Sequence, residues 1–275
     1  MYYHCASIQG RRPYNEDEYD VFDNLEGGNA GKVLSYFAVF DGHGGGSISK
    51  YLKANLRSYF VNDTVQVDPC KGKSYDKYIV KVYDFVQKQF VNFNQSAKAT
   101  GSTACVCIVH KYNNHMLLKM INLGDCRVVS CNTNNIAVPL TKDHKPTSFD
   151  EYQRITSNGG TITKETNDDH RINGLSVSRS FGDLDSKPHV SHLPDIYDYD
   201  LKKTKFFIMA CDGVWDVLGN QEAVDYVLSE MDMLKSDIKS NFTSSKAKAN
   251  IANKLVQYAY DRGSQDNLTA IIVFL

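Results

Sequence analysis

Aspartates stand at the ends of four apolar segments of this sequence. Asp41 and Asp212 follow the runs 36–40 and 206–211, and each is followed by glycine. Asp125 follows the run 116–123, and Asp266 precedes the run 268–275. A single Asp-Gly pair is more typical of a hairpin turn than of a ligand. Four aspartates at strand ends instead suggest a two-metal site, because carboxylate oxygens without His or Cys partners suit Mg²⁺ or Mn²⁺ rather than zinc.

Two further segments carry side chains that could act on a phosphate ester. The segment 10–17 places two arginines just before two acidic residues, and Arg12 could grip a phosphate while Glu16 and Asp17 orient metal-bound water. Ordinary surface charge is the simpler interpretation of this segment alone. His43 lies among glycines two residues after Asp41 and could donate a proton, although a loop histidine without a role is the alternative.

The bulk composition describes a globular protein without a strong overall charge. The 275 residues include 31 basic and 32 acidic ones, so no net field favours nucleic acid or an anionic membrane. A hydrophobic fraction of 42% is enough for a sizeable core. The sequence shows no signal peptide and no apolar run of membrane-spanning length. We therefore expect an intracellular monomer, cytoplasmic or nuclear, that binds neither nucleic acid nor membrane.

The seven cysteines do not indicate a disulfide framework or a zinc site. Their number is odd, and none of them forms a C-x-x-C pair. Cys105 and Cys107 alternate within an apolar run, where metal ligands and buried core residues are both conceivable. We interpret both as core residues with reduced thiols.

The periodicity of apolar residues predicts strands interrupted by pairs of helices. Strands are expected at 2–8, 36–40, 103–109, 116–123, 128–131, 206–211 and 268–275. Helical spacing appears at 48–59, 79–93, 220–231 and 251–259, with Asn220 as the expected start of the third helix. This order favours an α+β fold over the strict alternation of a doubly wound sheet.

One long polar segment, 147–190, lacks sustained periodicity and is expected to be an irregular excursion. A second segment, 235–248, is rich in Ser and Lys and is expected to be an exposed connection. Neither resembles a linker between separate domains. We therefore expect residues 1–275 to form a single domain.

Taken together in their order along the chain, the motifs resemble those of the metal-dependent protein phosphatases of the type 2C family. The matching motifs lie at residues 12–17, 39–45, 101–104, 122–127, 143–146, 151–160, 171–174, 178–183, 194–195, 210–216 and 263–267. The resemblance therefore covers the chain from end to end. It implies a catalytic domain without regulatory extensions, with the excursion 147–190 as a flap that influences the choice of substrate.

The family resemblance implies a sandwich of two antiparallel β-sheets flanked by antiparallel helix pairs, in four layers. It also implies two Mg²⁺ or Mn²⁺ ions, with Asp41 bridging both, the Gly42 carbonyl binding one, and Asp212 and Asp266 holding the other. Glu16 and Asp17 would bind through water. A bimetal-bound water would attack phosphoserine or phosphothreonine directly, without a phosphoenzyme.

The remaining roles implied by the resemblance concern phosphate binding, proton donation and a third metal. Arg12 would bind the phosphate, and His43 would protonate the leaving oxygen. Asp125 and Asp216 match positions that, together with Asp212, hold a weaker third ion in some relatives. The implied partners are phosphoprotein substrates.

Two other functional classes stay open on the sequence. A pseudophosphatase would keep the fold as a binding module, but such proteins usually lack some of the metal carboxylates that are present here. A two-metal nuclease would share the acidic site, but the sequence offers no basic, aromatic-rich support for a nucleic-acid strand.

Overall fold

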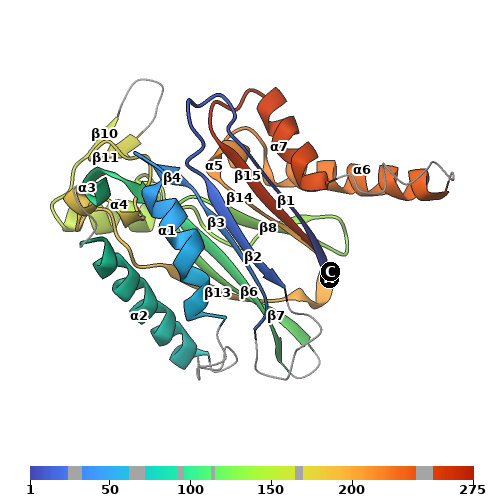
Figure 1. The fold of residues 1–275 in the computed structure, drawn as a ribbon, viewed down its shortest axis with the longest axis horizontal. Helices are drawn as coiled ribbons and strands as arrows, with labels where there is room; N and C mark the ends of the chain where they lie inside the picture. The colour runs from blue at the N-terminus through green and yellow to red at the C-terminus, as the bar shows by residue number, and fades with distance from the viewer. Residues whose placement is uncertain (24–32, 62–71, 92–95, 113–114, 165–169, 240–249) are drawn as a thin grey trace. The chain divides into compact units, whose positions relative to one another are not determined.

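The computed structural model describes residues 1–23, 33–61, 72–91, 96–112, 115–164, 170–239 and 250–275 (Figure 1). These residues divide into two compact units, each assembled from separate stretches of the chain. The terminal unit comprises Met1–Asn15, Arg127–Leu140 and Lys202–Leu275. The central unit comprises Glu16–Cys126 and Thr141–Leu201. Each unit is built on its own antiparallel sheet.

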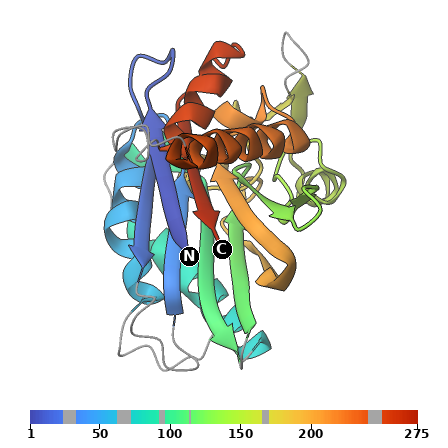
Figure 2. The same ribbon diagram turned by 90° about the vertical axis from the view of Figure 1, so that its right-hand side faces the viewer.

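The sheet of the terminal unit has five strands in the order β1-β15-β14-β8-β9. Their bounds are Tyr2–Ile8 for β1, Arg127–Asn132 for β8, Ala137–Pro139 for β9, Thr204–Ala210 for β14 and Leu268–Phe274 for β15. The interior strand β15 is apolar except for Thr269, and all of its residues are buried. Its pairing with β1 places Tyr2 opposite Phe274, so both chain ends lie beside each other (Figure 2).

Helices α6 (Asn220–Lys239) and α7 (Ile251–Asp261) belong to the same unit, and the short helix α5 (Asp212–Trp215) follows β14. Helix α7 begins at a cap in which the Asn250 side chain accepts a hydrogen bond from the Asn253 amide at 3.2 Å. Its apolar residues recur at helical spacing and pack with side chains of β1 and β15 in one core. Helix α6 begins at Asn220, as predicted, and extends to Lys239, beyond the predicted start of an exposed connection. Residues 240–248 of that connection lie outside the described residues.

The sheet of the central unit has the order β13-β7-β6-β3-β2. Its strands are β2 (Glu18–Asp23), β3 (Val33–Phe40), β6 (Ala104–Tyr112), β7 (His115–Leu123) and β13 (Asp195–Asp200). Cys105 and Cys107 lie fully buried in β6, and burial raises the pKa of both thiols. The core interpretation of these two cysteines is therefore confirmed, and the six described cysteines are all free.

Helices α1 (Ser47–Asn55) and α2 (Lys73–Phe90) pack against this sheet (Figure 1), with a 3₁₀ turn η2 (Leu56–Tyr59) after α1 and a short helix α3 (Ser96–Ala99) after α2. Their apolar faces share one core with β3, β6 and β7. A buried lysine joins α2 to two strands: Lys119 of β7 contacts Asp76 and Asp198 at 2.8 Å each. The two acidic partners compensate the cost of burying its charge.

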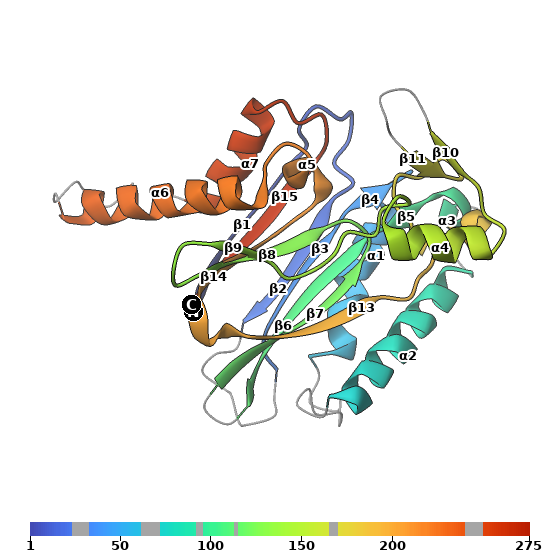
Figure 3. The same cartoon turned by 180° about the vertical axis from the view of Figure 1, so that it is seen from behind.

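The segment 147–190 is more ordered than the sequence predicts. It contains α4 (Phe149–Ser157), the hairpin of β10 (Ile162–Lys164) and β11 (His170–Ile172), and the turn η4 (Leu184–Ser186), as Figure 3 shows. A small core of Ile155, Ile172 and Val190 holds these pieces together. The expectation of an irregular excursion was wrong for these elements. The sequence did not reveal α4 because the helix buries only two residues, Ile155 and Glu151. Residues 165–169 lie outside the description.

The remaining elements of the central unit are short strands near the expected site. Strands β4 (Gly42–His43), β5 (Gly101–Ser102) and β12 (Phe181–Gly182) form a small sheet in the order β12-β5-β4. A 3₁₀ turn η5 (Leu201–Lys203) precedes β14. The predicted α+β class, with antiparallel sheets and covering helices, is confirmed. No helix within the described ranges is long and apolar enough to cross a membrane.

Candidate active site

Asp41 follows the last residue of β3, and Thr103 fixes the backbone at this point. The Asp41 amide donates to Thr103 Oγ1 at 3.1 Å, and the Thr103 amide donates to the Asp41 carbonyl at 2.8 Å. The chain then turns into β4 instead of forming a hairpin with the next long strand. The hairpin interpretation of Asp41-Gly42 is therefore excluded, and the carboxylate is carried on a rigid strand end.

Gly42 allows the segment of Glu16 and Asp17 to approach Asp41. A Cβ atom at Gly42 would lie 2.4 Å from the Glu16 carbonyl oxygen and 2.8 Å from Ser49 Oγ, so no larger residue fits. Ser49 of α1 donates to the same Glu16 carbonyl at 2.6 Å. Helix α1 and the Gly42 backbone thus hold the start of β2 against the end of β3.

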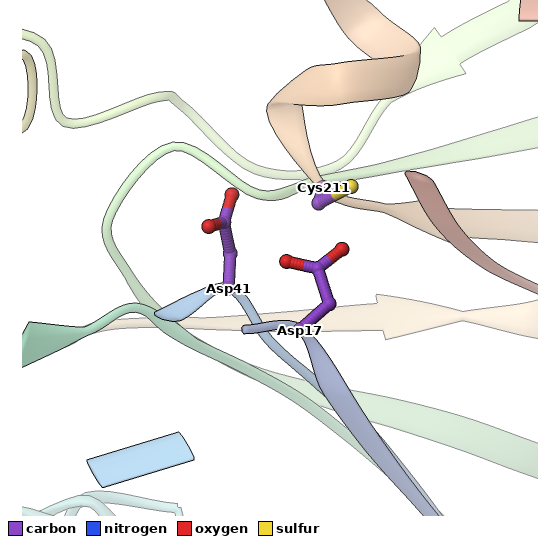
Figure 4. A group of neighbouring side chains, drawn as sticks. All are labelled: Asp17, Asp41 and Cys211. Carbon is purple, nitrogen blue, oxygen red and sulfur yellow. The ribbon is translucent and has the colours of Figure 1, made fainter. Parts of the chain in front are cut away.

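Three carboxylates of the central unit gather at this point. Oxygens of Asp17 and Asp41 lie within 4.8 Å of one another, and so do oxygens of Asp41 and Asp125. Figure 4 shows the side chains of Asp17 and Asp41 extending into the same space; the third labelled residue, Cys211, belongs to the terminal unit. Asp17 and Asp125 are buried, whereas Asp41 is half-buried. Carboxylates at this spacing repel one another, and a bound cation would offset that repulsion.

The donor atoms of this group fit a hard divalent cation. Asp125 is only 1% exposed, and its Oδ1 atom has no hydrogen-bond partner within the described residues. Its Oδ2 atom accepts a short hydrogen bond from Lys145 Nζ. An orphaned carboxylate oxygen beside the Asp41 carboxylate is an environment that suits Mg²⁺ or Mn²⁺.

His43 lies at the end of β4 and pairs with an aspartate to which the sequence reasoning gave no role. His43 Nε2 is 2.8 Å from Asp183 Oδ2, and the imidazole is 25% exposed while the carboxylate is buried. Asp183 also accepts a short hydrogen bond from Ser180 Oγ, and its amide donates to the Thr100 carbonyl at 3.0 Å. The carboxylate thereby fixes the orientation of the ring.

The terminal unit carries the other candidates, beginning with Arg12. Its Nη2 atom lies 2.5 Å from Asp266 Oδ2, just before β15, and the arginine side chain remains 55% exposed. Asn267 explains this proximity, because its side-chain amide donates to the carbonyls of Gln9 at 2.7 Å and Tyr14 at 2.8 Å. The loop with Arg12 is thus fastened to the start of β15. Sequence reasoning assigned no such role to Asn267.

Asp212 opens α5 beside the same loop. A Cβ atom at Gly213 would lie 2.0 Å from the Asn267 carbonyl oxygen and 3.3 Å from Asp266 Cβ, so the two loops touch through this glycine. Ser264 Oγ donates to the Gly213 carbonyl at 2.7 Å. Asp216 lies one turn after Asp212, is exposed, and donates its amide to the Asp212 carbonyl at 2.8 Å.

The predicted site residues are thus divided between the units. The central unit holds Glu16, Asp17, Asp41, Gly42, His43 and Asp125, and the terminal unit holds Arg12, Asp212, Asp216 and Asp266. Among the described residues, the closely spaced carboxylate groups do not include the side chains of Glu16, Asp216 and Asp266. Within each unit, residues far apart in the sequence nevertheless converge at strand ends.

Comparisons with known proteins give a consistent result. A family model described as Protein phosphatase 2C matches residues 2–268. A PP2C-like domain-containing protein of Acanthamoeba polyphaga mimivirus is 46% identical over 174 residues, which cover 57% of this chain and 93% of the viral protein. A probable protein phosphatase 2C of Arabidopsis thaliana is 36% identical over 273 residues, covering 98% of this chain and 66% of the plant protein.

The fold matches a solved structure at lower sequence identity. The serine-threonine phosphatase 2C of Toxoplasma gondii superposes with a TM-score of 0.77 at 23% identity, covering 99% of this chain and 94% of that one. At this identity the likeness concerns the fold alone.

Proposed function

Because the chain belongs to the protein phosphatase 2C family, we propose that it hydrolyses phosphoserine and phosphothreonine in phosphoproteins with Mg²⁺ or Mn²⁺ as cofactor. The observation that carries the proposal is the convergence of Asp17, Asp41 and Asp125 at strand ends. Family membership supports the enzyme class. The oxygen-only donor set supports the metal.

Family membership supports two metal ions per catalytic domain, and we take residues 1–275 as that domain. Asp41, the Gly42 carbonyl, Asp212 and Asp266 would hold the ions. Glu16 and Asp17 would act through water. The bound ions would supply an acidified water as nucleophile for direct, in-line attack on phosphorus.

The other catalytic tasks fall to side chains of the chain itself. Arg12 is exposed and its guanidinium can form two parallel hydrogen bonds to a phosphate, in exchange for its contact with Asp266. His43 would give a proton to the departing serine or threonine oxygen, held in place by Asp183. Asp125 and Asp216, with Asp212, would bind a weaker third ion.

The proposed substrates are intracellular phosphoproteins. We propose that the enzyme acts on them as a monomer. The near balance of 31 basic and 32 acidic residues supports neither nucleic acid nor an anionic membrane as a partner. The flap segment 147–190, with its own small core, is the part of the central unit that we propose contributes to the choice of phosphoprotein.

Separate substitutions distinguish the core ligands from the outer one. Asp212→Ala or Asp266→Ala should abolish turnover of a phosphoserine peptide, because each removes a ligand of the catalytic ion pair. Asp125→Ala should instead raise the Mn²⁺ concentration needed for half-maximal rate, because it removes only the outer ligand. Initial rates over an Mn²⁺ series measure both effects.

Two outcomes would count against parts of this assignment. If Asp212→Ala and Asp266→Ala keep the wild-type rate while remaining folded, the proposed ligand set is wrong. If Asp125→Ala keeps the wild-type rate and metal dependence, only the third ion is lost from the proposal. A pseudophosphatase would hydrolyse no phosphopeptide in any form of the protein, including the Mn²⁺-loaded wild type.

A further inference from the structure

Lys145 occupies one oxygen of the buried Asp125 carboxylate. Its Nζ atom makes a short hydrogen bond to Asp125 Oδ2, and the lysine side chain is 29% exposed while the aspartate side chain is 1% exposed. The other oxygen, Oδ1, has no hydrogen-bond partner in the part of the chain that the structure describes. One carboxylate therefore carries an internal cation on one oxygen and leaves the second oxygen open.

The backbone holds Lys145 in this position. His144 and Gly124 form two reciprocal hydrogen bonds, from the His144 amide to the Gly124 carbonyl at 2.9 Å and from the Gly124 amide to His144 Nδ1 at 3.0 Å. The other ring nitrogen of His144 contacts Asp195 at 3.1 Å. Residues directly before Lys145 and Asp125 are thus locked together, so the ammonium is preorganised toward the carboxylate.

The surrounding charge explains why an ammonium is favourable here. Asp125 is buried within 4.8 Å of a carboxylate oxygen of Asp41. Burial and mutual repulsion both disfavour two ionised carboxylates, and a cation at hydrogen-bond distance offsets both effects. A divalent ion at Asp125 would meet the same need, but it could not share Oδ2 with the ammonium without strong repulsion between like charges.

We propose that Lys145 lowers the metal affinity of the Asp125 site, by acting as an internal cation that repels an incoming ion and competes with it for the carboxylate. The inference rests on the proposed function in taking Asp125 as a ligand of a third, weaker ion. On this inference the third ion binds weakly because the Lys145 ammonium competes with it for the Asp125 carboxylate. Loss of the ammonium should therefore tighten binding at this site without creating a new ligand.

Direct binding of Mn²⁺ to the metal-stripped full chain tests this inference. Isothermal titration calorimetry would be run on wild type, Lys145→Met and Lys145→Arg. Lys145→Met should bind the weakest class of Mn²⁺ roughly tenfold or more tightly, because removal of one nearby positive charge relieves its repulsion of the ion. Lys145→Arg, which keeps the charge, should stay close to wild type.

The Asp125→Asn background tests whether the tighter Mn²⁺ binding of Lys145→Met occurs at Asp125. In this background the weakest Mn²⁺ class should disappear, and adding Lys145→Met should change nothing. Lys145→Gln serves as a second neutral variant if Lys145→Met does not fold, with the melting temperature of the metal-free proteins as the check.

The outcomes separate this inference from the proposed function. Unchanged or weaker Mn²⁺ binding in folded Lys145→Met and Lys145→Gln would overturn the role of Lys145 while leaving tight binding at the other ligands intact. Tightening that persists in the Asp125→Asn background would also overturn it. Absence of any Mn²⁺ binding in the wild type would instead contradict the proposed metal-dependent function itself.

Discussion

The pairing of His43 with Asp183 defines which atom of the imidazole can act on a substrate. A carboxylate only accepts hydrogen bonds, so His43 Nε2 carries the proton that points to Asp183 Oδ2 at 2.8 Å. To act as the proposed proton donor, the ring would carry a second proton on Nδ1, and that nitrogen would face the leaving group. The pair packs over Gly101, where a Cβ atom would lie 2.4 Å from the ring nitrogen and 2.1 Å from the carboxylate.

Substitution of His43 should show a dependence on the leaving group. A serine alkoxide is a strong base and needs a proton as it departs, whereas p-nitrophenolate leaves readily without one. His43→Gln should therefore slow hydrolysis of a phosphoserine peptide by about 10²- to 10⁴-fold, the usual range for general acid catalysis, with a much smaller effect on p-nitrophenyl phosphate. Steady-state rates on both substrates at saturating Mn²⁺ measure this selectivity.

Asp183→Asn is the matched variant for this test. It keeps the size of the side chain but weakens the hold on the ring, so it should show the same selectivity with a smaller loss. Equal losses on the two substrates would indicate damage to the adjacent Asp41-Gly42 segment. His43 would then not be the proton donor.

At the residue scale, candidate metal ligands can be selected from the sequence, whereas the side chains that contact and position them cannot. Asp41, Asp125, Asp212 and Asp266 could be selected because each stands at the end of an apolar run. Asp183 and Lys145 could not be given roles in this way, since their partners lie 140 and 20 residues away and no local periodicity connects them. Only the tertiary structure brings such pairs together.

At the scale of elements, a buried ionic network holds α4 to the rest of the flap segment. The Glu151 carboxylate is buried and accepts hydrogen bonds from Arg179 at 2.7 and 3.0 Å, from Arg154 at 2.8 Å and from Ser178 at 2.7 Å. Burial alone would raise the pKa of Glu151, but these hydrogen bonds outweigh it and lower the pKa to about 2.

This network predicts a pH-dependent contribution to stability. The folded-state pKa of Glu151 lies below its usual value of 4.5, so its stabilisation is complete above that pH and is lost as the pH falls toward about 2. Glu151→Gln should lower the free energy of unfolding by roughly 2 kcal/mol at pH 7. The difference from wild type should shrink below pH 4.5.

Urea unfolding of the two metal-stripped proteins between pH 7 and pH 3 would measure this difference. The proteins are metal-stripped because pH-dependent loss of bound metal would itself change the free energy of unfolding. A difference that stays constant over the whole range would show that the Glu151 charge does not stabilise the fold.

The long apolar elements were predictable, whereas the edge elements were not. Strands β3, β6, β7, β14 and β15 lie where the apolar runs place them, and α7 begins at the predicted residue. The edge strands β2 and β13 were missed because their sequences, EYDVFD and DIYDYD, place acidic residues between the aromatic ones. Helix α4 was missed because Ile155 is the only apolar residue that it buries.

At the scale of the whole molecule, the order of the strands within each sheet could not be predicted from the sequence. The sheet of the terminal unit joins the first and last strands of the chain to β8 and β14 from its middle. The pairing of β1 with β15 joins the two ends of the chain, and β14 pairs with strands far from it in the sequence, which local patterns do not encode. The motif resemblance supplied the fold class and the enzyme family, and both are confirmed by the antiparallel sheets and the family match.

The central claim is that the chain is a metal-dependent protein phosphatase, and one measurement tests it most directly. Metal-stripped wild-type protein should release no phosphate from a phosphoserine peptide, and added Mn²⁺ or Mg²⁺ should restore the release, because every proposed side-chain ligand is a hard oxygen donor. Full activity in the stripped protein, or no activity in folded protein supplied with Mn²⁺, would contradict the claim.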